Sequence, residues 1–130
     1  PHPTPARRHF AAFPAGGNRF GRRLCYGGHV ISLCRALSHD GLETAFAVAA
    51  IHGGTHANPT FAGDTLYCRH VVLGRDEIPG RRDVGALRLR MLGVKNQVLA
   101  ELPTVGAGEK HPAVVLDLDY SVLIARRQNP

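Results

Sequence analysis

The stretch 23-RLCYGGHVISLCRALSHDGL-42 decides the fold, because it holds the clearest helical pattern in the chain. Its apolar side chains recur at intervals of three and four residues, which is the period of an α-helix with one apolar face. They are Val30, Ile31, Leu33, Cys34 and Leu37. We expect a helix of about three turns over residues 28–38, ended by Gly41. Its polar side is thin, so we expect it to be mostly buried.

Two glycines, Gly27 and Gly28, stand directly before this apolar run, although glycine is a poor helix former. The first N–H groups of a helix have no intrahelical acceptor and lie at the positive end of the helix dipole. A residue without a side chain lets a ligand approach those N–H groups closely. The pair therefore favours a helix start that is open to a polarised carbonyl. The alternative is that both glycines only relieve crowding between the helix and a sheet.

Five segments after the helix have the pattern of β-strands: 45–51, 65–73, 84–92, the weaker 94–102, and 114–127. Residues 45–51 form a continuous run of mostly small apolar side chains, which is typical of a strand buried on both faces. The segments 84–92 and 114–127 instead alternate between apolar and polar side chains. This alternation predicts that Asp117 and Asp119 face solvent rather than forming a catalytic pair of carboxylates. Loops rich in glycine or proline separate the strands at 53–64, 74–83 and 103–113.

One buried helix followed by four or five strands predicts an α+β domain over residues 24–130. In such a domain a curved antiparallel sheet of about five strands wraps around the helix. The sheet would normally include a strand before the helix. Residues 1–23, however, contain several prolines and glycines without a sustained period, so we expect them to be irregular. The first strand is then missing or supplied by a partner, or the chain is one half of a longer polypeptide.

The composition and the cysteine pattern indicate which cellular compartment suits the chain. With 130 residues, 44% of them hydrophobic, the chain is expected to form one ordered domain. It has no apolar stretch of the roughly 20 residues that span a membrane, and no pattern of a secretory signal. Its three cysteines lack a C-x-x-C pair. They argue against a disulfide framework or a zinc site and favour a reducing, cytoplasmic setting.

The charge distribution indicates which classes of partner the chain can bind. The net charge is +6, and the first 23 residues carry five arginines and no acidic residue. Such a skew suits nucleic acid or a phosphate-bearing ligand. Nucleic-acid modules usually add stacking aromatic side chains or a reading helix, and neither is evident here. We therefore expect no nucleic-acid partner and no membrane partner.

Two segments, 24-LCYGGHVISLCRAL-37 and 58-NPTFAGDTLYCRHVV-72 with its P-x-x-x-G-D-T-L turn, resemble the MaoC-like hydratase branch of the hotdog fold. More narrowly, three stretches look like the C-terminal half of the double-hotdog mesaconyl-CoA hydratases: 19-RFGRRLCYGGHVISLCRALSHDGLE-43, 80-GRRDVGALRLRMLGVKNQ-97 and 114-VVLDLDYSVLIARR-127. The resemblance implies a hotdog fold in an enzyme that adds water to, or removes it from, the double bond of an enoyl-CoA thioester. It implies a homodimer or a second hotdog half as partner, and no cofactor beyond the coenzyme A of the substrate.

The resemblance also implies catalytic residues. The family's oxyanion glycine corresponds to Gly28, whose N–H would bind the thioester oxygen, and Gly27 would shape the turn before it. The family's His-x-Asp pair lies shortly before the helix, where His9 is placed to match the histidine. Ala11 stands where that motif has an acidic residue or an amide. Whether this chain is itself catalytic therefore stays open.

Other side chains are candidates for binding the substrate. Tyr26 and His29 flank the helix start, where they face the thioester pocket or simply pack against the helix end. His56 and Asn58 precede the G-D-T-L turn and are candidates to line the acyl pocket. Three basic side chains are candidates for the phosphates of coenzyme A, although exposed strand faces commonly carry such charges: Arg88, Arg90 and Lys95.

Two further patterns are given structural explanations. Asp64 and Thr65 are expected to form a turn with local hydrogen bonds. His52 and His56 have the four-residue spacing of a helical metal site, but the stretch 52-HGGTH-56 holds two glycines in a strand–loop context. We therefore predict no metal site.

Two alternatives to a hydratase remain. A hotdog acyl-CoA thioesterase would use the same helix start to polarise the thioester, but it needs a carboxylate nearby, and Asp40 and Glu43 follow the opposite end of the helix. A non-catalytic lobe that only binds coenzyme A or supports assembly is favoured by Ala11.

Overall fold

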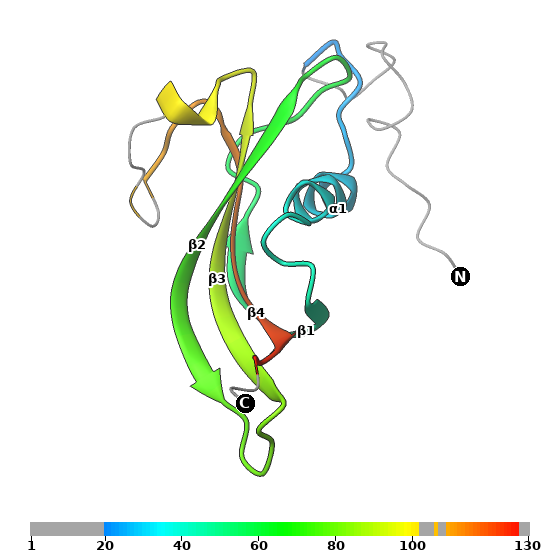
Figure 1. Cartoon of the computed structure of the whole chain (residues 1–130). Helices are drawn as coiled ribbons and strands as arrows, with labels where there is room; N and C mark the ends of the chain where they lie inside the picture. The colour runs from blue at the N-terminus through cyan, green and yellow to red at the C-terminus, as the bar shows by residue number, and fades with distance from the viewer. Residues whose placement is uncertain (1–19, 102–105, 107–108, 128–130) are drawn as a thin grey trace, which may run out of the picture.

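The computed structural model describes residues 20–101, 106 and 109–127. Its elements follow the chain as α1 (Gly27–Leu37), β1 (Ala45–Thr55), β2 (Leu66–Glu77), β3 (Val84–Lys95), the short 3₁₀-helix η2 (Leu99–Glu101) and β4 (Val114–Ala125) (Figure 1). The expected α+β class is confirmed. His9 and the other residues before Phe20 lie outside the described part of the chain.

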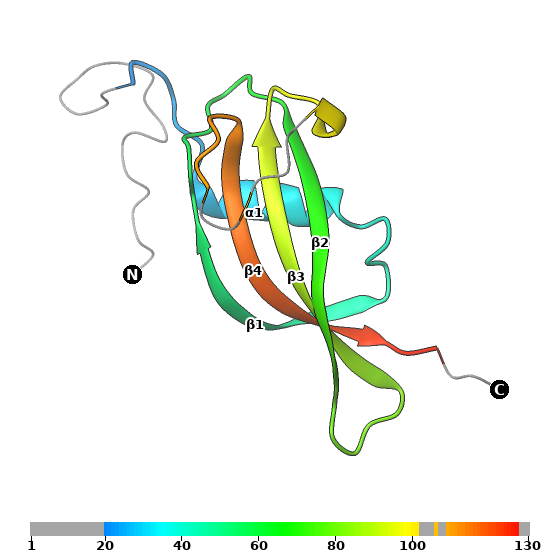
Figure 2. The ribbon, with the colours of Figure 1, turned by 90° about the vertical axis from the view of Figure 1, so that its left-hand side faces the viewer.

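The four strands form one antiparallel sheet in the order β1-β4-β3-β2. The last strand in sequence therefore lies inside the sheet and pairs with the first. The sheet is long and curved, and α1 crosses one of its faces (Figures 1 and 2). This is the helix-and-curved-sheet arrangement that the sequence predicts.

The core lies between α1 and the sheet. Alternate residues of β3 and β4 point to the helix, as the sequence pattern requires. Gly93 allows a close approach, because a Cβ at this position would lie 2.8 Å from the Cys34 sulfur. The buried side chains that meet there include Val30, Cys34, Leu89, Met91, Leu116, Leu118, Tyr120 and Val122. Burying one large apolar side chain stabilises the fold by about 1.5–3 kcal/mol.

The expectation that the helix is mostly buried is wrong. Only Val30 and Cys34 are buried among its residues. Leu33 and Leu37 belong to the same apolar pattern, yet they are 40% and 57% exposed. The reason is that the described sheet covers one side of α1, so the apolar side chains on the flank of the helix stay largely exposed.

The expectation that 45–51 is buried on both faces is also wrong. β1 is an edge strand, paired with β4 on one side only. Phe46, Val48 and Ile51 are 62%, 55% and 66% exposed. Its register with β4 shifts at three places, as bulges in edge strands do. An apolar run alone cannot distinguish a strand inside one domain from a strand that another chain would cover.

The weak candidate strand at 94–102 does not exist as a separate strand. Val94 and Lys95 are the last residues of β3, and Leu99–Glu101 form η2. Asn96 ends the strand because its φ of 56° turns the chain. Its side-chain oxygen accepts from the N–H of Thr65 at 2.9 Å, and its own N–H donates to the Thr65 carbonyl at 2.9 Å.

β4 ends at Ala125, before the expected end at 127, whereas β1 and β2 extend further than expected. β1 runs to Thr55 and β2 to Glu77, so both include glycines that were assigned to loops. Pairing with a long neighbour keeps these residues extended, which local propensity does not reveal. In the described part of the chain, no helix has both the length and the apolar character needed to cross a membrane.

Candidate functional site at the start of helix α1

A pocket of about 410 Å³ lies beside the first turn of α1. One wall comes from the segment that leads into the helix, and the other from residues 56–60, which follow β1. The lining residues are Phe20, Leu24, Cys25, Gly27, Val30, His56, Ala57, Asn58, Pro59 and Thr60. The sequence singled out Gly27, His56 and Asn58. It missed Phe20, Cys25 and Thr60, which reach the pocket only because the two segments pair.

The helix start lacks a side-chain cap. Tyr26 is the N-cap residue, and its carbonyl accepts from His29 N at 3.0 Å and Val30 N at 3.2 Å. Within the described part of the chain, the N–H groups of Gly27 and Gly28 donate to no protein acceptor. These are the unpaired donors that a helix N-terminus offers to an anionic oxygen.

Both glycines are covered by rings. A Cβ at Gly27 would lie 2.6 Å from His56 Nε2, and a Cβ at Gly28 would lie 2.5 Å from Tyr26 Cε1. The crowding that the glycines relieve is therefore with these two rings and not with the sheet. Gly27 lines the pocket, whereas the ring of Tyr26 lies against Gly28. Tyr26 is 64% exposed.

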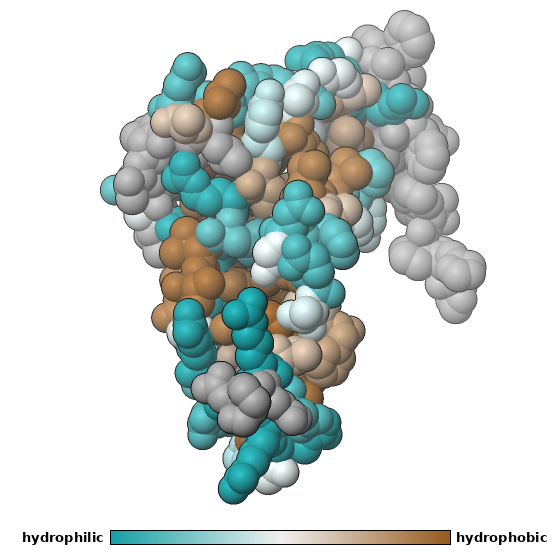
Figure 3. All heavy atoms as spheres, in the orientation of Figure 1, coloured by the Kyte–Doolittle hydropathy of each residue, from teal (hydrophilic) through white to brown (hydrophobic). Residues whose placement is uncertain are grey.

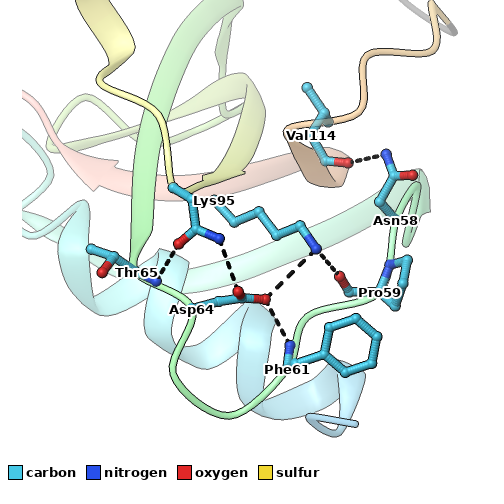
Figure 4. A network of polar contacts seen from close by, with 8 residues as sticks. Asn58, Pro59, Phe61, Asp64, Thr65, Lys95 and Val114 are labelled. Carbon is cyan, nitrogen blue, oxygen red and sulfur yellow. Dashed lines mark hydrogen bonds and ion pairs between the residues drawn. The ribbon is translucent and has the colours of Figure 1, made fainter. Parts of the chain in front are cut away.

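Hydrogen bonds hold the second wall, residues 56–60, in place (Figure 4). Asn58 Nδ2 donates to the carbonyls of His111 at 2.9 Å and Val114 at 2.7 Å. Lys95 Nζ donates to the Pro59 carbonyl at 2.6 Å. Cys25, in the segment before the helix, donates its N–H to the Thr60 carbonyl at 2.8 Å and thereby joins this segment to the wall. Asn58 thus lines the pocket with its amide nitrogen already used for the fold.

Asp64 closes the turn after this wall, as predicted. One carboxylate oxygen accepts from Phe61 N at 2.8 Å, and the other accepts from Asn96 Nδ2 at 2.9 Å. Burial alone would raise the pKa of Asp64. The hydrogen bonds from Phe61 and Asn96 and the nearby charges of Lys95 and Arg22 outweigh it and lower the pKa.

The ring of Phe61 lies between two cations. The Arg22 guanidinium carbon is 4.7 Å from its centroid, and Lys95 Nζ is 5.3 Å away. Lys95 also lies 3.6 Å from Asp64. These contacts give Lys95 a structural role in the turn. That Lys95 also binds a phosphate of coenzyme A stays a prediction.

Arg88 and Arg90 lie on the other face of the sheet from α1, because the intervening Leu89 packs in the core. Arg88 binds both carboxylate oxygens of Asp119 at 2.9 and 2.7 Å. Arg90 binds both oxygens of Asp117 at 2.9 and 2.8 Å. The predicted outward face of the two aspartates is confirmed, and the arginines neutralise them. Whether either arginine also meets a phosphate stays a prediction.

The other candidates lie apart. His29 is exposed at the helix start. His52 Nε2 is 2.7 Å from the Ser121 hydroxyl, whereas the His56 ring lies against Gly27. The two histidines therefore contact different residues. Glu43 accepts from Gly41 N at 3.0 Å, beyond the far end of α1. The geometry brings together Gly27, Gly28, Tyr26, His56 and Asn58.

Comparison with known proteins gives this arrangement a family. No protein-family model matches the chain. The chain is 50% identical over 123 residues to β-methylmalyl-CoA dehydratase of Chloroflexus aurantiacus, an alignment that covers 94% of the chain and 35% of that protein. Its fold matches a crystal structure of a MaoC domain protein dehydratase from the same organism, with a TM-score of 0.85 and 49% identity over 95% of the chain and 36% of that structure.

The chain is a MaoC-like hotdog domain. It is also 47% identical over 116 residues to mesaconyl-CoA hydratase of Cereibacter sphaeroides, covering 88% of the chain and 33% of that protein. The X-ray structure of the monoamine oxidase regulatory protein from Archaeoglobus fulgius has the same fold at a TM-score of 0.68, with 19% identity over 93% of the chain and 72% of that structure. The MaoC-like domain thus spans about a third of the length of the curated relatives it matches.

Proposed function

We propose that this domain is part of an acyl-CoA hydratase or dehydratase. It would add water to, or remove it from, the double bond of an enoyl-CoA thioester, with mesaconyl-CoA as the model substrate. The observation that carries the proposal is the start of α1, where Gly27 lines the pocket and the N–H groups of Gly27 and Gly28 donate to no acceptor among the described residues. The relatives of this domain are named as a β-methylmalyl-CoA dehydratase and a mesaconyl-CoA hydratase.

The helix start suits the charge that the reaction develops. When water adds to an enoyl thioester, negative charge builds on the thioester oxygen as the enolate forms. A fixed N–H donor binds this oxygen more strongly as the charge grows, and one such donor is typically worth about 3–4 kcal/mol. Gly28 N–H is the proposed donor. Gly27 sets the turn and leaves space for the ring of His56 beside the pocket.

The proton-transfer groups are proposed to come from elsewhere. A hydratase needs a base for the water and an acid for the α-carbon. In the sequence, Ala11 replaces the acidic residue of the family's dyad beside His9. A second hotdog half would supply a competent dyad, while this domain binds the thioester. No cofactor other than the coenzyme A of the substrate is required for this chemistry.

A second hotdog also explains the exposed apolar strand. Among the described residues, β1 has one edge without a partner strand and exposes the apolar side chains of Phe46, Val48 and Ile51, and such edges usually pair or are covered. We therefore propose that β1 joins a homodimer or a second half of a longer polypeptide. The free thiols of all three cysteines favour a reducing compartment, the cytoplasm.

The hydratase proposal is tested by incubating the purified protein with crotonyl-CoA and with mesaconyl-CoA. Loss of the absorbance of the conjugated double bond without release of free thiol is the expected result. Thiol release would mean a thioesterase, which the position of Glu43 beyond the far end of α1 disfavours. Stabilisation by coenzyme A without turnover would mean a binding or assembly lobe, the role that Ala11 favours.

A further inference from the structure

A cluster of two thiols and three polar side chains lies between the C-terminal half of α1 and the sheet. We call it the thiol cluster, and it consists of Cys34, Ser38, Cys68, His70 and Tyr120. Cys68 Sγ is 3.4 Å from Ser38 Oγ and 3.9 Å from His70 Nδ1. His70 Nε2 in turn is 2.7 Å from the hydroxyl of Tyr120. The pocket beside Gly27 includes none of these side chains, so the proposed hydration does not account for them.

The cluster is arranged to hold a negative charge on one sulfur. Cys34 lies close to Cys68, because Cys68 is paired with Gly93 across the sheet and a Cβ at Gly93 would lie 2.8 Å from the Cys34 sulfur. The interaction with Cys34 is the largest cause that lowers the pKa of Cys68; burial opposes this effect, and His70 adds to it. The same interaction, together with burial, raises the pKa of Cys34. The two directions favour the thiolate on Cys68 over a thiolate on Cys34.

The hydrogen bonds around His70 agree with this assignment. Tyr120 is 2% exposed, and burial raises the pKa of its hydroxyl, which keeps the hydroxyl a donor. If the Tyr120 O–H donates to His70 Nε2, the proton of the neutral ring is on Nδ1 and faces the Cys68 sulfur. Ser38 Oγ donates to the Cys34 carbonyl at 2.6 Å and thereby fixes the end of the helix beside both thiols.

We propose that Cys68 is the site at which a peroxide oxidises this domain, and that Cys34 then forms a disulfide with it. The bond would join α1 to β2. The two cysteines differ in solvent exposure. Cys68, which peroxide must reach, is partly exposed near the edge of the sheet, whereas Cys34, its disulfide partner, is fully buried. Cys25, the third cysteine, lines the pocket at the other end of the helix.

The chemistry balances with hydrogen peroxide as the oxidant. The Cys68 thiolate attacks one peroxide oxygen, the O–O bond breaks, and hydroxide leaves, which gives a sulfenic acid on Cys68. The Cys34 sulfur then attacks the sulfenic sulfur, the S–O bond breaks, and the oxygen leaves as water with the Cys34 proton. Two thiols are oxidised, one peroxide is reduced, and the chain loses two hydrogen atoms.

The test is peptide mass spectrometry of the unaltered protein after mild treatment with hydrogen peroxide and alkylation of the remaining thiols. We expect a linked peptide pair containing Cys34 and Cys68, reversible by dithiothreitol, with Cys25 alkylated. A linkage that includes Cys25, or no linkage at peroxide levels that already oxidise Cys25, overturns the proposal. This measurement does not depend on the folding of any variant.

Four variants then assign the roles. Cys34→Ser should stop at the sulfenic acid of Cys68, which dimedone traps, and Cys68→Ser should leave Cys34 reduced. The matched control Cys25→Ser should form the linkage at the rate of the unaltered protein. His70→Asn should slow the first step several-fold, since it removes the ring beside the sulfur. If Cys34→Ser yields no dimedone adduct on Cys68 while remaining folded by circular dichroism, the assignment of Cys68 as the oxidised sulfur fails.

Discussion

The imidazole of His56 lies directly against the backbone of Gly27, so closely that a Cβ at Gly27 would be 2.6 Å from Nε2. The two residues come from different segments, the first turn of α1 and the loop after β1. Their contact defines how far the pocket extends along the helix start. It therefore offers a way to change the shape of the site without removing a polar group.

Gly27→Ala should push the His56 ring out of its position. Crowding of this kind typically costs about 1–3 kcal/mol, but His56 is exposed and its ring can move, so we expect a small loss of stability and a larger change in KM. The double variant Gly27→Ala with His56→Ala should recover part of the KM. If the second substitution restores nothing, the two residues do not set the pocket together.

Gly28→Pro should reduce turnover by about 10²–10³-fold, because it removes the N–H proposed to bind the thioester oxygen. Proline is tolerated in the first turn of a helix, so the domain should still fold, as circular dichroism will check. Gly28→Ala is the matched control. It adds the same Cβ against the exposed Tyr26 ring but keeps the N–H, so it should lose much less activity. Equal losses in the two variants would show that the N–H has no special role.

Lys95→Met should destabilise the turn at 59–64. The substitution removes the donor to the Pro59 carbonyl and the cation beside Asp64. A lost hydrogen bond from a charged group typically costs about 1.5–3 kcal/mol, which urea unfolding will measure. Lys110→Met, at an exposed position, is the control and should change stability little. An equal effect of both would mean that the loss is one of net charge.

The same pair of variants should differ in their pH dependence. The pKa of Asp64 is lowered in the folded chain, so its carboxylate adds stability above its unfolded pKa of about 3.9. That contribution is lost as the pH falls through the folded pKa. Without Lys95 the folded pKa rises, so Lys95→Met should lose its acid stability at a higher pH than Lys110→Met. The free energy of unfolding of both variants is measured in urea between about pH 2 and 5. If both lose stability over the same pH range, this expectation is wrong.

Arg90→Ala should cost more stability than Arg88→Ala. The Arg90 side chain is 14% exposed and also donates to the Gly106 carbonyl at 2.9 Å, whereas the Arg88 side chain is 47% exposed. Salt should weaken the Arg88 pair more, since exposed charges are screened. Thermal unfolding at two salt concentrations measures both effects. A rise in KM for acyl-CoA in either variant would support its predicted contact with phosphate, and an unchanged KM would remove it.

Ile51→Lys should weaken assembly through β1, because it places a charge where we propose that a second hotdog covers the strand. Sedimentation velocity should show a shift from dimer to monomer if the partner is a second copy. Val72→Lys is the matched control on the opposite edge, since Val72 is 52% exposed on β2. Figure 3 shows apolar surface over this edge at the left of the view. Loss of assembly only in the control would place the interface on β2.

The local patterns predicted most of the elements. The spacing of Val30, Cys34 and their neighbours located α1 to within a residue at each end. The alternation around Leu89 assigned the two faces of β3 correctly, because each strand there has one buried face. Asp64 was recognised as a turn residue from its own side-chain chemistry.

What failed depended on partners distant in sequence. The burial of 45–51 was wrong because burial requires a neighbour, and β1 has one on a single side. The role of Lys95 in the turn could not be foreseen, since Pro59 and Asp64 reach it only through the pairing of β2 with β3. The pocket lining by Cys25 and Thr60 depends in the same way on two backbone hydrogen bonds between distant segments, from Cys25 N to the Thr60 carbonyl and from Ala62 N to the Arg23 carbonyl.

The position of β4 has a consequence for biosynthesis. β1 leaves the ribosome before β2, β3 and β4, but its only described neighbour in the sheet is β4. Until β4 has emerged, Phe46 and Ile51 therefore belong to a strand that has no described partner, at the time when aggregation competes most with folding. Cotranslational pulse proteolysis should find β1 protected only after residue 125 has emerged, and a chain stalled before β4 should depend on a chaperone to stay in solution.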